Sequence, residues 1–141
     1  MSIDIAETWP AGAHAPAVRV SGPSGLYFLS GINPNPLHAG QPMTEDEERL
    51  PAGIREQTLR TLLNLVDVLT AGGLTWHNVA KILVYVTDIR EAPIVREMIA
   101  ERFGTDWTPA VTTVQVDNLV ARGARVQFDV IAAGPPAAAT D

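Results

Sequence analysis

Two polar side chains near the C-terminal end of the chain, Gln127 and Asp129, are of types that can take part in acid–base chemistry and stand two residues apart. They belong to residues 125–132, where β-branched and aromatic residues predict a strand. Because side chains two apart on a strand share one face, both are expected to point to the same place. An amide such as Gln127 can hold a water molecule but cannot take its proton, whereas the carboxylate of Asp129 can act as a general base. Such a pair is compatible with hydrolytic chemistry, but its spacing alone does not assign it that role.

Most other reactive residues lack the spacing that their chemistry needs. The three histidines stand far apart, without the pattern of metal ligands. Ser24 and Ser30 lack the histidine and aspartate arrangement of a catalytic triad. No cysteine is present, which excludes disulfides, thiolate nucleophiles and cysteine-bound zinc. The sequence therefore predicts no metal site.

The charge of the chain limits its partners and its location. The formal net charge is -6 and the basic residues are scattered, so neither nucleic acid nor an anionic membrane surface is an expected partner. The N-terminus carries acids where a signal peptide needs positive charge. No apolar run approaches the ~18–20 residues that span a bilayer. A soluble, cytoplasmic protein is expected.

Apolar periodicity predicts one domain in the order strand, strand, helix, strand, helix, strand, strand. The first helix is expected at residues 54–71, with Gly72 and Gly73 as its C-cap. Its expected buried stripe is Leu59, Leu62, Leu63, Val66 and Leu69. A hairpin is expected from two strands at residues 18–20 and 26–30. Further strands are expected at 79–87, 111–116 and 125–132, and a second helix at 93–103.

The strand expected at residues 79–87 is apolar on both faces. Leu83 and Tyr85 occupy one face, and Ile82, Val84 and Val86 the other. Two amphipathic helices can cover only one face of such a sheet. An uncovered apolar face of this size is typical of a subunit interface. Self-association through the sheet is therefore expected, although the pattern does not fix its symmetry.

Five short stretches of the chain occur in the order and spacing of a known protein family. They are LSGINP at residues 29–34, EQT at 56–58 followed by Asn64 and Leu65, NVAK and VYVTD at 78–81 and 84–88, TPAVTT at 108–113, and VQFDVIA at 126–132. These stretches resemble the S-G-Q-I-P, E-Q-T…N-L, D-V-V-K…V-F-L-T-D, F-P-A-R-S and V-E-I-E-A-I-A segments of the RidA/YjgF family of enamine/imine deaminases. The resemblance runs from Ala15 to Ala132.

The resemblance implies an α+β, chorismate-mutase-like fold with a mixed sheet and two helices on one face. It also implies a homotrimer packed sheet to sheet, with small-molecule pockets at the subunit interfaces. The family hydrolyses reactive imines and enamines without a cofactor, so no cofactor is expected here. Residues 15–133 are expected to form the domain. Residues 1–14 and 134–141, which lack periodicity, are expected as a loose N-terminal segment and a disordered tail.

Several positions that carry the family's chemistry differ in this chain. Val111 stands where the family has an arginine that grips a carboxylate, and Gln127 stands where it has a water-orienting glutamate. Ala17 replaces a tyrosine of the pocket wall, and Arg96 replaces an asparagine. Arg96 could restore the carboxylate contact and Asp129 could restore the base. A surface role for Arg96 and a structural role for Asp129 stay open.

The candidate site therefore has a catalytic and a substrate-binding part. The residues expected to act in catalysis are Gln127, Asp129 and Arg96. Those expected to contact the substrate are Ala17, Ser30, Gly31, Tyr85, Val111, Thr112 and Thr113. The serine and the threonines offer hydroxyls, although threonine is also common in strands for its β-propensity alone. The glycine lets a ligand approach the backbone closely.

Two classes of function remain open. One is a RidA-like hydrolase or deaminase that acts on a small imine, enamine or related unstable metabolite with non-standard specificity. The other is a non-catalytic trimer that binds a small molecule or another protein, because losing an arginine and a glutamate together fits either class. Ribonuclease activity, which has been attributed to family members, is disfavoured by the acidic charge and the lack of a histidine pair.

Overall fold

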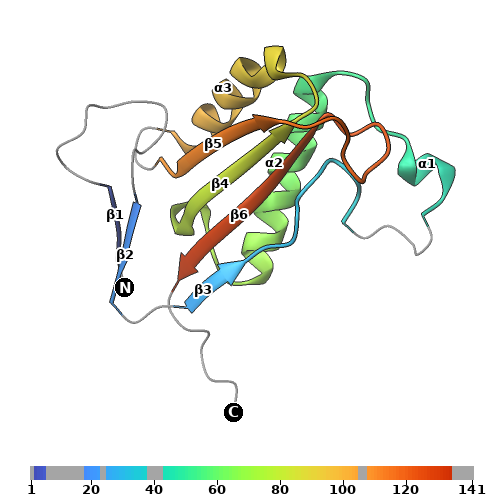
Figure 1. The fold of residues 1–141 in the computed structure, drawn as a ribbon. Helices are drawn as coiled ribbons and strands as arrows, with labels where there is room; N and C mark the ends of the chain where they lie inside the picture. Colours follow the sequence, from blue (N-terminus) through green and yellow to red (C-terminus); the bar gives the residue numbers. More distant parts are fainter. Residues whose placement is uncertain (1, 6–17, 23–24, 38–42, 105–107, 135–141) are drawn as a thin grey trace.

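The structure is a computed structural model that describes residues 2–5, 18–22, 25–37, 43–104 and 108–134. Its main sheet has four strands in the order β3-β6-β4-β5, and α2 and α3 lie on one side of it (Figure 1). The strands are β1 (Ser2–Ile5), β2 (Val18–Ser21), β3 (Gly25–Phe28), β4 (Val79–Val86), β5 (Ala110–Gln115) and β6 (Val126–Gly134). The helices are α1 (Glu45–Glu48), α2 (Ile54–Ala71) and α3 (Ala92–Phe103), with 3-10 turns η1 (Trp76–Asn78) and η2 (Ile89–Glu91). Among the described residues, no helix combines the length and the apolarity needed to cross a membrane.

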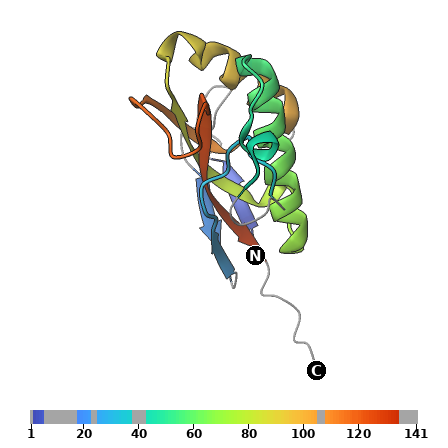
Figure 2. The same cartoon turned by 90° about the vertical axis from the view of Figure 1, so that its right-hand side faces the viewer.

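The mixed sheet confirms the α+β fold predicted from the sequence. β4 pairs antiparallel with β6 and parallel with β5. Parallel neighbours need a crossover connection, which η2 and α3 supply between β4 and β5. Ile82, Val84 and Val86 of β4 are fully buried, and Figure 2 shows the long helices stacked against that side of the sheet. The core therefore lies between the helices and one face of the sheet.

The helix α2 has the predicted bounds but a different buried face. Leu59 and Leu63, which were expected in the core, are 47% and 45% exposed. Gln57, Thr58 and Thr61 are buried in their place. The prediction for the two leucines was wrong because it ranked side chains by hydrophobicity alone. Polar side chains can be buried where hydrogen bonds replace their contacts with water.

Gln57 shows how that replacement works. Its Nε2 donates to the carbonyl oxygens of Pro51 at 2.7 Å and Gly123 at 2.9 Å. Its Oε1 accepts from the backbone N–H of Arg125 at 2.7 Å. One amide thus joins the start of α2 to the segment that enters β6. Because two of these partners are 66 and 68 residues away in sequence, periodicity within the helix carries no signal of them.

Strands form in both arms of the predicted hairpin, but the two arms do not pair with each other. β2 pairs with β1, and β3 pairs with β6. A hairpin prediction weighs only adjacent segments, whereas each arm here has a partner elsewhere in the chain. β1 lies within residues 1–14, which the sequence predicts as a loose segment. Gly134, which the sequence predicts as the first residue of the tail, is the last residue of β6. The other residues of those two segments lie outside the described residues.

Candidate functional site

In the described part of the chain, no helix covers the sheet face opposite α2 and α3, and this face carries several apolar side chains. Leu83 and Tyr85 of β4 point to this face, because the residues that alternate with them are buried under the helices. The register places Asp129 of β6 beside Leu83 and Gln127 beside Tyr85. At the β3 edge of the same sheet, the side chain of Phe28 is 73% exposed. The apolar second face predicted from the sequence is confirmed, and it carries the two polar residues of interest.

A cavity of about 350 Å³, here called the open-face cavity, opens on this side of the sheet. Its lining residues are Gly31, Tyr85, Val116, Asn118, Leu119, Val120, Gln127 and Asp129. β4 and β6 supply the floor, the segment after β3 supplies the glycine, and the loop between β5 and β6 supplies mainly apolar walls. Four residues predicted from the sequence therefore come together here: Gly31, Tyr85, Gln127 and Asp129.

The position of Gln127 depends on Gly31. A β-carbon built on Gly31 would lie 2.6 Å from Nε2 of Gln127 and 3.1 Å from its Cδ, which is closer than non-bonded atoms approach. The Gln127 amide thus lies directly against the glycine backbone. An isolated bridge fixes that backbone, since Ile32 N donates to Phe128 O at 2.8 Å and Phe128 N donates to Ile32 O at 2.7 Å. Gly31 therefore leaves room for the Gln127 amide to lie against the backbone.

The charge inside the open-face cavity is negative. Among the described residues that line it, Asp129 alone carries a charged side chain. Lys81 lies on the same sheet face, but its Nζ donates to Oγ1 of Thr112 at 2.7 Å. Arg125 is held outside the cavity, with its Nη2 2.7 Å from Oε2 of Glu91. In the described ranges, no group of three or more His, Cys, Asp or Glu side chains could hold a metal ion.

Three predicted site residues lie on the helix side of the sheet. Val111 is in register with Ile82 and packs against the core, and Thr113 is in register with Val84. Arg96 is exposed on α3. Within one chain, the sheet itself therefore separates these three from the open-face cavity. Thr112 points to the open face, where it accepts the hydrogen bond from the lysine.

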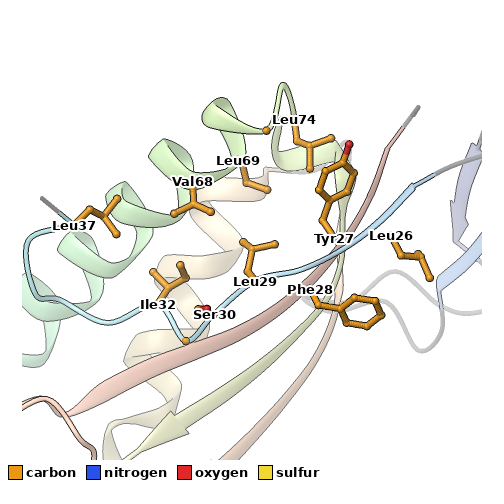
Figure 3. A pocket seen from close by; sticks show the side chains of 12 residues that line it. Leu26, Tyr27, Phe28, Leu29, Ser30, Ile32, Leu37, Val68, Leu69 and Leu74 are labelled. Carbon is orange, nitrogen blue, oxygen red and sulfur yellow. The ribbon is translucent and has the colours of Figure 1, made fainter. Parts of the chain in front are cut away.

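A second cavity, of about 570 Å³, lies between the segment around β3 and the C-terminal half of α2 (Figure 3). Its lining residues are Leu26, Tyr27, Phe28, Leu29, Ser30, Gly31, Ile32, Leu37, Val68, Leu69, Gly72 and Leu74. The predicted contact Ser30 belongs to this cavity, and Ala17 lies outside the described residues. Its described lining includes no carboxylate, amide or cation, whereas the lining of the open-face cavity includes Asp129, Gln127 and Asn118.

The sequence analysis missed the loop that walls the open-face cavity. Val116, Asn118, Leu119 and Val120 all line it. A signal was present, because two adjacent apolar residues precede the turn at Gly123 where no strand periodicity requires them. Val120 is fully exposed in the single chain. A single exposed apolar residue is common on protein surfaces, but Val120 also lines the open-face cavity.

The chain is similar to one protein family, both by its family model and by its relatives. A family model described as Endoribonuclease L-PSP matches residues 11–134. A RutC family protein of Aquifex aeolicus is 30% identical over 125 residues, covering 87% of this chain and 90% of the relative. A 2-iminobutanoate/2-iminopropanoate deaminase of Bos taurus is 31% identical over 87 residues, covering 62% of each protein.

Solved structures show the same fold. A Rid-family protein of unknown function from Yersinia pestis, YyfA, matches with a TM-score of 0.66 and 26% identity, over 93% of this chain and 98% of that one. A protein of Thermotoga maritima described as a putative endoribonuclease matches with a TM-score of 0.63 and 28% identity, over 91% of this chain and 89% of that one. Sequence and structure therefore agree along most of the chain.

Proposed function

The chain belongs to the RidA/YjgF family, the family of the Endoribonuclease L-PSP model, and we propose that it hydrolyses a small imine or enamine in the open-face cavity. One observation carries the proposal. The cavity holds a carboxylate, Asp129, and an amide, Gln127, side by side on β6, with the phenol of Tyr85 on the neighbouring strand. The deaminase named among the relatives supports the reaction class.

The proposed reaction uses one water molecule and needs no cofactor. Gln127 holds the water by hydrogen bonds, and Asp129 accepts a proton as the water oxygen bonds to the imine carbon. The C=N double bond becomes a single bond, and the nitrogen takes up a proton. The carbinolamine then expels ammonia as the C=O bond forms, so that an imine and water give a carbonyl compound and ammonia. An enamine enters the same sequence after protonation at carbon.

We propose that the working form is a homotrimer in which copies cover one another's open face. The exposed apolar side chains of Leu26, Phe28 and Val120 support this, because a chain in isolation would leave them in water. In that assembly the open-face cavity becomes an inter-subunit pocket. The proposal includes a cytoplasmic location, which cell fractionation can check.

The test compares ammonia release by the full-length protein with that of an Asp129→Asn variant. Imines are generated during the assay by an amino acid oxidase or an amine oxidase, with catalase present to remove peroxide. We expect the wild-type protein to accelerate hydrolysis and the variant to lose about 10²–10⁴-fold of that acceleration, the usual contribution of a general base. Asp117→Asn is the matched control, because this exposed acid is in the adjoining loop but does not line the cavity. No acceleration by wild type with any imine or enamine tested would remove the proposal.

A non-catalytic binding protein is the second candidate, and the amide at Gln127 favours it. An amide cannot take a proton, so one of the two polar groups on β6 contributes no base. This candidate predicts ligand binding without turnover. The variant Gln127→Glu distinguishes the two, because Gln127 lines the open-face cavity, and the appearance of imine hydrolysis in a previously inactive protein would show that the cavity kept its geometry and had lost only a proton acceptor.

A further inference from the structure

We infer that the open-face cavity selects small cations that carry no carboxylate, with an iminium derived from a simple amine as the reactive example. The selection by charge is a property of the cavity alone, whereas turnover of the iminium rests on the proposed function. At about 350 Å³ the cavity is at the small end of the range for small-molecule sites, about 300–1,000 Å³. Its size therefore fits a short aliphatic chain.

The first argument is the sign of the charge. Asp129 is the charged group of the described lining, and Val116, Leu119 and Val120 contribute apolar surface to the same cavity. Asp129 is exposed in the single chain. If a second copy covers the open face as proposed, the lower dielectric there strengthens both the attraction of a cation and the repulsion of an anion. A bound carboxylate would place two like charges in one small space without a compensating partner. A cation instead supplies an ion-pair partner to Asp129, which has none among the described residues.

The second argument is the position of the cationic side chains near the sheet. Lys81 is on the same face, but it reaches across to Thr112 on β5, away from the strand that carries Asp129. Arg90 forms an ion pair with Asp88 at 2.8 Å. Its hydrogen bonds hold the pKa of that carboxyl below the ordinary value. Each of these cations already has a partner outside the cavity.

Arg122 is exposed in the loop that walls the cavity but is not among the lining residues, and two other arginines are engaged or on the helix side. Arg125 pairs with Glu91 and donates from Nη1 to Ala52 O at 2.7 Å. Arg96 is exposed on α3, on the helix side of the sheet. A carboxylate in the open-face cavity would therefore have no cation from the described lining of its own chain.

The third argument is the set of neutral polar groups. The side-chain oxygens of Asn118, Gln127 and Tyr85 can all accept hydrogen bonds, and Asp129 accepts through two oxygens. An ammonium or iminium group presents N–H donors to these oxygens. The amide N–H and phenol O–H groups of the same side chains can also donate, so the neutral groups fit a cation and Asp129 supplies the preference for it. One carboxylate oxygen can hold the nitrogen while the other accepts the proton of the attacking water. The same groups thus fit both binding of a cation and its hydrolysis.

The binding test uses the full-length protein and probes of similar size and opposite charge. Propylammonium and propionate are titrated separately while side-chain amide signals are followed by NMR, with the Asn118 and Gln127 signals assigned by substitution. We expect propylammonium to shift these signals and propionate to leave them unchanged. Asp129→Asn is expected to weaken propylammonium binding by at least roughly tenfold, as for loss of a hydrogen bond to a charged group. The control Asp117→Asn is expected to bind like wild type.

Two results would overturn the inference. One is the absence of propylammonium binding at these signals. The other is propionate binding as tightly as propylammonium. If propionate binding disappeared in Arg96→Ala, the cation would come from Arg96 of a second copy, and the cavity would be one for carboxylates.

A turnover test separates this inference from the proposed function. Imines made from propylamine by an amine oxidase are compared with imino acids made by an amino acid oxidase. We expect faster hydrolysis of the propylamine-derived imine. Hydrolysis restricted to imino acids would refute the inference and keep the proposed function. Binding of propylammonium at Asp129 without hydrolysis of either substrate would keep the inference and refute the proposed function.

Discussion

At the scale of single residues, the site depends on the contact between the backbone of Gly31 and the side-chain amide of Gln127. Gly31 has no positive φ, since the described glycines with positive φ are at other positions. Its backbone conformation is therefore open to alanine. What excludes a side chain at this position is Gln127, whose Nε2 would lie 2.6 Å from a β-carbon. Gly31 therefore affects the site by setting the position of the Gln127 amide.

Gly31→Ala should therefore affect binding more than stability. The end of a flexible side chain can move aside, so we expect a change in melting temperature of only a few degrees, on the order of 1 kcal/mol. The displaced Gln127 amide should weaken propylammonium binding several-fold. Gly53→Ala is the matched control, because a β-carbon there meets no atom within 4 Å. Thermal unfolding and NMR titration measure the two effects. Equal affinity in the two variants would show that Gly31 does not position the amide.

At the scale of elements, α2 shows what the sequence predicts well and what it does not. Its bounds follow from local features, namely helical spacing and the glycines after Ala71, and the prediction is confirmed. Its buried face depends on partners far away in sequence. Gln57 is buried because Gly123 and Arg125 accept and donate its hydrogen bonds. The spacing of apolar residues within one helix therefore underestimates the burial of Gln57 and overestimates the burial of Leu63.

On α2 we therefore expect the replacement of a buried polar residue to cost more stability than the truncation of an exposed leucine. Gln57→Leu should destabilise the protein by about 2–4 kcal/mol, because the Arg125 N–H and two backbone carbonyls lose their partner in a buried place. Leu63→Ala should change stability by only about 0.5 kcal/mol, since surface substitutions have small effects. Urea unfolding at one fixed protein concentration checks both, because association contributes to apparent stability. A larger loss for Leu63→Ala would show that this outer face of α2 is covered.

At the scale of the whole molecule, the order of elements was predictable and their pairing was less so. Periodicity identifies β4 and β6 from their own residues, but it cannot tell that β6 lies between β3 and β4. The cavity depends on this arrangement, which brings Gly31, Tyr85 and Gln127 together from three separate segments. The resemblance of short stretches to a family supplied the fold because their order and spacing carry information about pairing. The resemblance could not predict that the loop at Leu119 and Val120 lines the cavity, because none of the quoted stretches includes these residues.

The last prediction concerns the open face as a whole. Phe28 is in register with Ile131 and is 73% exposed in the single chain. Phe28→Asp should leave the core intact and place a charge where another copy would pack, which costs several kcal/mol for an unpaired buried charge. Light scattering should therefore show a fall from about three times 15.1 kDa to a single chain, with an unchanged circular dichroism spectrum. Leu63→Asp, on the helix side, is the control and should keep the wild-type mass. If the Phe28 variant also kept that mass, or if wild type itself were a single chain, the open-face cavity would be a surface cleft of one chain and would not be an inter-subunit pocket.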